Sequence, residues 1–138
     1  MSGHGHLINI DVGFDSAIDR VTEALKTEGF CVLTCINIDE AFRDKLGVDF
    51  RRYTILGACN PQLAHEALSA DPEVGMMLPC NVCVEETQVG SRVHMADPAA
   101  MMMAGGFDDN PELHEFGKNA GVRLARAAAA IARFSTPG

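Results

Sequence analysis

The dipeptide Asn-Pro occurs twice in the chain, at Asn60-Pro61 and Asn110-Pro111, and each occurrence marks the start of a helix. Proline lacks a backbone N–H and has φ fixed at about −65°, so it suits the first turn of a helix better than a helix interior or a central strand. The asparagine before it can accept hydrogen bonds from the unpaired N–H groups of that first turn. The two pairs therefore predict helices that begin after residues 60 and 110.

The spacing of apolar residues predicts the other elements. Phe14, Ile18, Val21 and Leu25 form one stripe of a helix that ends at Gly29, and a similar stripe predicts a long final helix up to Phe134. A short helix is predicted to start with Asp39 as its cap and to end at Gly47, and another is predicted at residues 101–103. Strands are predicted at residues 7–12, 30–38, 50–58, 81–86 and 91–96, of which the last two form a β-hairpin.

The irregular alternation of these elements favours an α+β fold, an antiparallel sheet with helices packed on one face, over a parallel doubly wound sheet. At 138 residues with 47% hydrophobic content, the chain is expected to form a single domain over residues 1–138 and not a disordered segment. Residues 1–6, which include His4 and His6, are expected to be a flexible arm without a role.

Charge and hydropathy exclude several classes of partner. The formal net charge of −8 repels phosphate backbones and anionic membranes, so no nucleic acid partner is expected. The apolar runs are shorter than the roughly 20 residues that span a bilayer, and the N-terminus lacks the pattern of a signal peptide, so we expect a cytoplasmic protein without membrane contact.

Two of the five cysteines stand where a predicted strand meets a turn. Cys59 directly precedes the helix that starts at Pro61, and the helix N-terminus is expected to lower the pKa of its thiol modestly. Cys80 follows Pro79 at the start of another strand. Each is either a reactive thiol or a small packed residue. If both face one cavity, they can bind a soft metal or exchange sulfur or electrons.

The other sulfur-containing residues and the histidines carry weaker signals. Cys80 and Cys83 match the C-x-x-C pattern, but residues three apart in a strand point to opposite faces. Cys31 and Cys35 are expected to share one face and to be buried. Methionine thioethers suit copper(I) or an axial position on haem, although core packing is their commoner use. His65 is either a base for Cys59 or a solvated helix residue.

The segments Leu46–Phe50, Leu56–Pro61, Ala64-His65 and Leu78–Val82 together resemble the family called domain of unknown function 302, over about residues 7–98. The resemblance implies a curved antiparallel sheet with helices on one face, similar to half of the TATA-binding protein, and often a homodimer. It implies no activity.

The resemblance also suggests where a site lies. The residues that match the family pattern there, and that we take as candidate ligand-binding residues, are Cys59, Asn60, Pro61, Pro79, Cys80 and Asn81. The family usually has acidic residues on both sides of Ile36, where this chain has Cys35 and Asn37, and an aliphatic residue at Cys83. A role that needs those carboxylates is therefore in doubt, and a thiol or soft-ligand role gains weight.

Three functions remain open from the sequence. The first is a small homodimeric binding protein that holds a small ligand, a soft metal such as copper, haem or a sulfur species near Cys59 and Cys80. The second is a thiol-dependent enzyme or sulfur carrier with Cys59 as its nucleophile, assisted by His65 or Asn60. The third is a structural or partner-binding domain in which both cysteines only pack. The absence of common catalytic motifs favours a protein that is not an enzyme.

Overall fold

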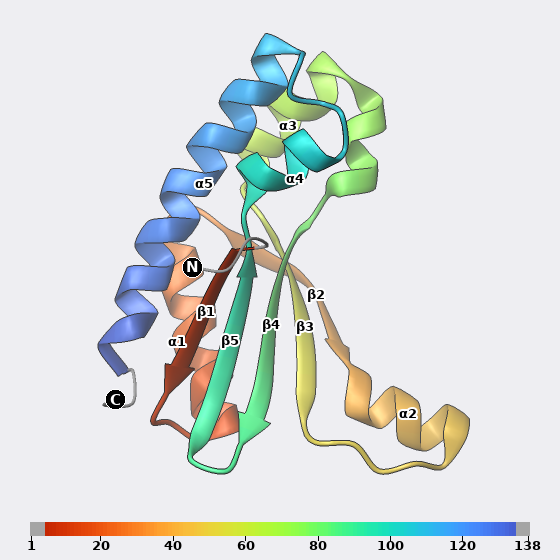
Figure 1. Ribbon diagram of the computed structural model, residues 1–138, viewed down its shortest axis with the longest axis vertical. Coiled ribbons are helices and arrows are strands. Elements are labelled where there is room, and N and C mark those ends of the chain that lie inside the picture. The colour runs from red at the N-terminus through yellow and green to blue at the C-terminus, as the bar shows by residue number, and fades with distance from the viewer. Residues whose placement is uncertain (1–4, 135–138) are drawn as a thin grey trace.

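The computed structural model of the chain describes residues 5–134 and shows one open five-stranded antiparallel sheet (Figure 1). The strands are β1 (Gly5–Ile10), β2 (Cys31–Asn37), β3 (Tyr53–Cys59), β4 (Cys80–Thr87) and β5 (Gly90–Ala96). They lie in the order β1-β5-β4-β3-β2, so β1 and β2 form the two edges. The fold is α+β, as predicted.

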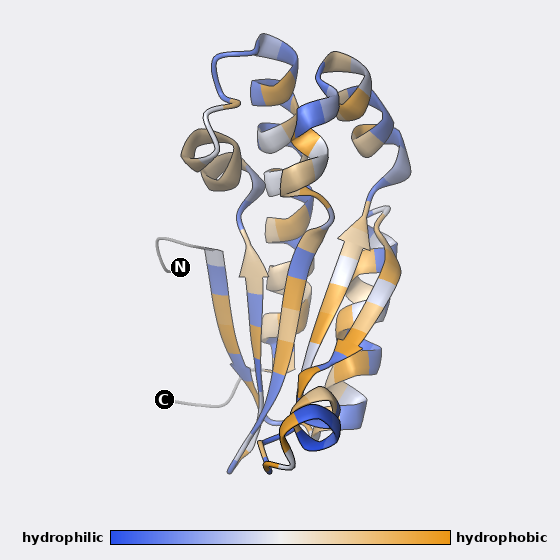
Figure 2. Ribbon diagram, turned by 90° about the vertical axis from the view of Figure 1, so that its right-hand side faces the viewer, coloured by the Kyte–Doolittle hydropathy of each residue, from blue (hydrophilic) through white to orange (hydrophobic). Residues whose placement is uncertain are grey.

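Besides the sheet, residues 5–134 form seven helical segments. They are α1 (Phe14–Thr27), α2 (Ile38–Leu46), α3 (Pro61–Ala70), the 3₁₀ turn η1 (Pro72–Met77), α4 (Pro98–Ala104), α5 (Pro111–Ile131) and the 3₁₀ turn η2 (Ala132–Phe134). α1 and α5 pack on one face of the sheet and against each other. α3, η1 and α4, here called the end cap, gather at one end of the sheet, and α2 projects at the other end (Figures 1 and 2).

The core forms where the sheet meets α1 and α5. Strand residues alternate between this face and the opposite one, which is visible as alternating hydropathy along the ribbons (Figure 2). The buried apolar strand residues of this core include Ile8, Ile10, Leu56, Ala58, Cys80, Val82, Val84, Val93 and Met95, and the helices contribute Val21, Leu25, Leu113, Phe116, Leu124 and Ile131 among others. Burial of each large side chain contributes about 1.5–3 kcal/mol.

Both Asn-Pro predictions are confirmed. The Asn60 side chain accepts a hydrogen bond from the Leu63 N–H at 3.2 Å, and Asn110 accepts one from the Glu112 N–H at 3.0 Å. Pro61 and Pro111 are the first residues of α3 and α5. The predicted hairpin is also present, with Thr87 and Gly90 as its last pair.

Two local predictions are wrong. Gly5 and His6 belong to β1 because they pair with Ala96 and Met95 of β5, so the predicted flexible arm does not include them; residues 1–4 lie outside the described residues. Asp39 does not cap α2. Its carboxylate instead accepts a hydrogen bond from the Tyr53 N–H at 3.1 Å, which ties α2 to the start of β3.

The burial predicted for Cys31 and Cys35 is also wrong, because both are exposed. They lie in β2, an edge strand in which every residue except Val32 is exposed. A register shift between Val32 and Thr34 inserts an extra residue, so Cys31 pairs with Cys59 whereas Cys35 pairs with Leu56. Since alternate residues of β3 point to opposite faces, the shift also places Cys31 and Cys35 on opposite faces of the sheet.

Candidate functional site

A cavity of about 290 Å³, here called the thiol cavity, lies where the sheet meets the end cap. It sits at the end of β3 and the beginning of β4, below α3 and η1. The side chains around it are predominantly apolar. The lining residues are Phe30, Leu33, Ala58, Cys59, Asn60, Ala64, Leu68, Gly75, Leu78, Pro79, Cys80 and Phe116.

Cys59 and Cys80 both line this cavity. Cys59 is the last residue of β3 and is half-buried, whereas Cys80 is the first residue of β4 and is buried. The β3–β4 register pairs Ala58 with Cys80, which brings Cys80 next to Cys59. The structure therefore brings together the two thiols that the sequence singled out. Their use in binding stays a prediction.

The remaining candidate residues divide between the cavity and the surface. Asn60 and Pro79 line the cavity, but Pro61 and Asn81 do not and are exposed. Asn81 pairs with Gly57 in the sheet, one position beyond Cys80, and so belongs to the opposite face. His65 is exposed on α3 and does not line the cavity.

Gly57 fixes how the β3–β4 end of the sheet is built. A Cβ atom at Gly57 would lie 2.2 Å from Thr34 Oγ1 and 2.8 Å from Pro79 Cγ. Only glycine lets the Pro79 ring and the Thr34 side chain approach the strand this closely. Pro79 follows a cis Leu78-Pro79 peptide bond and directly precedes Cys80. Gly57 thus allows Pro79, the residue directly before β4, to pack against β3.

The environment of the cavity keeps its thiols protonated at neutral pH. Burial raises the pKa of Cys80 to about 11, and the neighbouring Cys59 adds to this rise. Burial also raises the pKa of Cys59, with a smaller contribution from Cys31. Because charged thiolates are poorly solvated in an apolar wall, both groups favour the neutral form.

The predicted lowering of the Cys59 pKa is therefore wrong. At the start of α3, the Asn60 side chain accepts the Leu63 N–H and the Asn60 carbonyl accepts the Ala64 N–H. Pro61 has no N–H to offer. Burial of the half-buried Cys59 side chain is the largest influence on its pKa and raises it.

This arrangement offers few ligands for a metal ion. Across the part of the chain that the structure describes, no three or more His, Cys, Asp or Glu side chains gather in an arrangement able to hold a metal ion. A soft metal at Cys59 and Cys80 would have two protein ligands, and both would first have to lose a proton. Among residues 5–134, neither a methionine nor a histidine lines the cavity to supply an axial ligand for haem.

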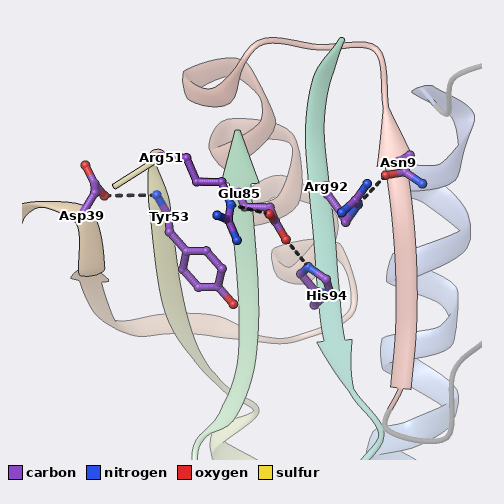
Figure 3. A network of polar contacts seen from close by, with 7 residues as sticks. All are labelled: Asn9, Asp39, Arg51, Tyr53, Glu85, Arg92 and His94. Carbon is purple, nitrogen blue, oxygen red and sulfur yellow. Dashed lines mark hydrogen bonds and ion pairs between the residues drawn. The ribbon is translucent and has the colours of Figure 1, made fainter. Parts of the chain in front are cut away.

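A polar cluster on the opposite face of the sheet was missed by the sequence analysis (Figure 3). The Glu85 carboxylate lies 2.8 Å from Arg51 Nε and 2.6 Å from His94 Nε2. Burial acts to raise the pKa of Glu85, but hydrogen bonds from His94 and Arg51 outweigh it, and the pKa is lowered. The alternating polar residues of the two hairpin strands were the available signal.

The polar cluster around Glu85 connects side chains of neighbouring strands of the sheet. Glu85 pairs with Arg92 and Cys83 with His94 in the β4–β5 ladder, so the cluster links neighbouring strands. Cys83 lies beside the Tyr53 side chain on this face, whereas Cys80 lines the cavity. The prediction that the two C-x-x-C cysteines point to opposite faces is thus confirmed.

Within residues 5–134, no helix combines the length and the apolar character needed to cross a membrane.

Comparison with known proteins places the chain among proteins without an assigned activity. The family model described as "Domain of unknown function DUF302" matches residues 8–131. A similar solved structure is the crystal structure of an uncharacterized conserved protein DUF302 from Bacillus stearothermophilus. The two chains are 31% identical over 94% of this chain and 98% of that chain, with a TM-score of 0.81. A search of curated proteins found no match.

Proposed function

We propose that this chain, which belongs to the family described as Domain of unknown function DUF302, binds a small, uncharged and largely apolar molecule in the thiol cavity. The observation that carries the proposal is an apolar cavity whose two thiols, Cys59 and Cys80, stay neutral. The family description assigns no activity, so the argument rests on the chemistry of the cavity.

The size of the cavity limits the ligand. At about 290 Å³ it lies at the lower end of the roughly 300–1,000 Å³ that is typical of small-molecule sites. The rings of Phe30 and Phe116 supply flat apolar surface, and the aliphatic side chains of Leu33, Leu68 and Leu78 complete the wall. A compact molecule of up to about three rings, or a short aliphatic chain, matches these dimensions.

The charge of the ligand follows from the lining. Of the described residues that form the cavity, none carries a formal charge at neutral pH, and the polar groups are the Asn60 amide, two thiols and the backbone. An ionic ligand would lose its hydration without gaining a counter-charge. A neutral molecule with few polar atoms avoids that cost, while the polarizable sulfurs add favourable contacts with aromatic rings.

A soft metal such as copper(I) is the second candidate, because Cys59 and Cys80 face the same cavity. Thiolates are the ligands that copper(I) prefers. Binding would require both thiols to lose protons in an environment that raises their pKa, which places this candidate behind the neutral ligand. Metal analysis of freshly purified protein, with a Cys80→Ala variant as the control, separates the two candidates.

The proposal is tested by titrating the protein with the uncharged fluorescent probe N-phenyl-1-naphthylamine. Ala64 lines the cavity from α3, so Ala64→Phe fills it, whereas Ser69→Phe places the same side chain on the exposed surface of the same helix. We expect saturable binding that Ala64→Phe weakens at least tenfold and Ser69→Phe leaves within twofold. Equal effects of both substitutions, or no saturable binding, would overturn the proposal.

A further inference from the structure

We propose that Cys31 and Cys59 are a redox modification site, at which a low-molecular-weight disulfide converts the two thiols into one cross-strand disulfide and so alters the thiol cavity. Formation of the bond stands on the geometry of β2 and β3. Its effect on the cavity rests on the proposed function.

The two cysteines lie directly opposite each other in the sheet. Cys31 is the first residue of β2, Cys59 is the last residue of β3, and they are register partners in the antiparallel ladder. Directly opposed residues point to the same face with Cα atoms about 4.5–5.5 Å apart. That separation lies within the range of about 4.4–6.8 Å that a disulfide spans.

The side chains are already close to one another. The Cys31 thiol donates a hydrogen bond to the Cys59 carbonyl oxygen at 3.4 Å, and its proximity adds to the rise in the pKa of Cys59. Cys31 is exposed on an edge strand, so a dissolved reagent reaches it, and Cys59 is half-buried behind it. Both thiols are free in the structure.

The other cysteines lack such a partner across the ladder. Cys35 pairs with Leu56, Cys80 with Ala58, and Cys83 with both Ile55 and His94. Cys80 is a neighbour of Cys59 but is buried in the cavity wall and staggered by one residue. The register therefore selects the Cys31–Cys59 pair.

The chemistry proceeds as two thiol–disulfide exchanges. The Cys31 thiolate attacks one sulfur of the reagent R–S–S–R, whose S–S bond breaks and releases RS⁻, leaving a mixed disulfide on Cys31. The fraction of Cys59 that is deprotonated, which is small because burial raises the pKa of this thiol, then attacks Cys31 Sγ and expels the second RS⁻. The two protein thiols give up two electrons and two protons, and the reagent becomes two RSH molecules.

The bond changes the cavity at two places. It fixes Cys59, a lining residue, toward β2, and it tethers the strand two residues before Leu33, which also lines the cavity. The oxidised protein then offers a ligand one thiol fewer and an altered apolar wall. We expect it to bind N-phenyl-1-naphthylamine at least threefold more weakly than the reduced protein.

The test exposes the reduced full-length protein to oxidised glutathione, caps the remaining thiols with N-ethylmaleimide and identifies linked peptides by mass spectrometry. Chymotrypsin cleaves after Leu33 and after Leu63, which separates Cys31 from Cys35 and Cys59 from Cys80. We expect a Cys31–Cys59 link that Cys31→Ser abolishes. Cys35→Ser, on the same exposed strand, is the matched control and should retain the link.

Each outcome bears on a separate claim. A Cys59–Cys80 link, or a mixed disulfide on Cys31 that never resolves, would overturn the modification site even if the probe still binds the reduced protein. A Cys31–Cys59 link that leaves the probe affinity unchanged would overturn its effect on the cavity. Failure of the reduced protein to bind the probe at all would instead count against the proposed function, because the link is detected without any ligand.

Discussion

At the scale of single residues, the protonation state of Cys80 decides what the cavity can do. A thiol is a nucleophile or a metal ligand only as the thiolate. Burial in an apolar wall raises the pKa of Cys80 to about 11, so the group is neutral at the pH of a cell. A neutral thiol contacts a ligand without attacking it, which favours binding over catalysis at this position.

The pH dependence of alkylation tests this assignment. In variants that retain one cysteine, Cys80 should react with iodoacetamide with a midpoint near pH 11, and Cys59 with a midpoint above the value of 9.0 for a free thiol. The reason is that burial opposes formation of both thiolates. A midpoint for Cys59 near or below pH 6 would instead favour the hypothesis of a thiol-dependent enzyme with Cys59 as its nucleophile.

The same raised pKa makes folding stability depend on pH. Between about pH 9 and pH 11 the unfolded chain releases the Cys80 proton while the folded chain keeps it. The contribution of the neutral thiol to the free energy of unfolding is therefore fully present below about pH 9 and is lost as the pH rises toward 11. Urea unfolding of wild type and Cys80→Ala at pH 8 and pH 10 should show a smaller loss in the variant.

At the scale of elements, the junction of β3 with β4 determines the shape of the cavity. Gly57 allows the side chains of Thr34 and Pro79 to pack closely against β3. Pro79 directly precedes Cys80, the first residue of β4. Three segments that are distant in sequence thus meet at a position without a side chain.

Gly57→Ala is expected to destabilise the protein by about 1–3 kcal/mol, because the new Cβ would overlap Thr34 Oγ1 and crowd Pro79. Gly13→Ala is the matched control, since a Cβ there meets no atom within 4 Å and Gly13 has an ordinary φ of −62°. Urea denaturation provides the measurement. Equal stabilities of the two variants would show that the junction tolerates a side chain.

Local chemistry in the sequence predicted most elements of the fold. Asn60-Pro61 and Asn110-Pro111 place helix starts because the cap and the proline act within one turn. The hairpin followed from a short loop between two alternating segments. These signals depend only on residues that are close in the sequence, so they can be recognised without knowledge of the tertiary structure.

Two predictions that depended on tertiary context failed. Cys31 and Cys35 have the composition of a buried strand, but their burial depended on the position of β2 at the edge of the sheet. The pKa of Cys59 depended on how deeply the fold buries its side chain, which raises the pKa. The lining residues Phe30 and Phe116 lie far from Cys59 in sequence, and no local pattern connects them.

At the scale of the whole molecule, the exposed edge of the sheet bears on assembly. The sheet has two edge strands, β1 and β2, and an edge strand is a place where another chain can add. We propose that the protein is a homodimer, as the family resemblance implies. Sedimentation equilibrium at micromolar concentration should give twice the chain mass of 14.8 kDa, and a monomer alone would exclude the proposal.

The most direct test of the account is to locate a bound ligand in the thiol cavity by nuclear magnetic resonance. In the complex with N-phenyl-1-naphthylamine, we predict intermolecular nuclear Overhauser effects from the probe to the methyl groups of Leu68 and Leu78 and to the Phe116 ring. These groups come from α3, the segment before β4, and α5, and all three line this cavity. Effects confined to the Arg51–Glu85–His94 face, or to exposed residues of β2, would contradict the assignment of the cavity as the binding site.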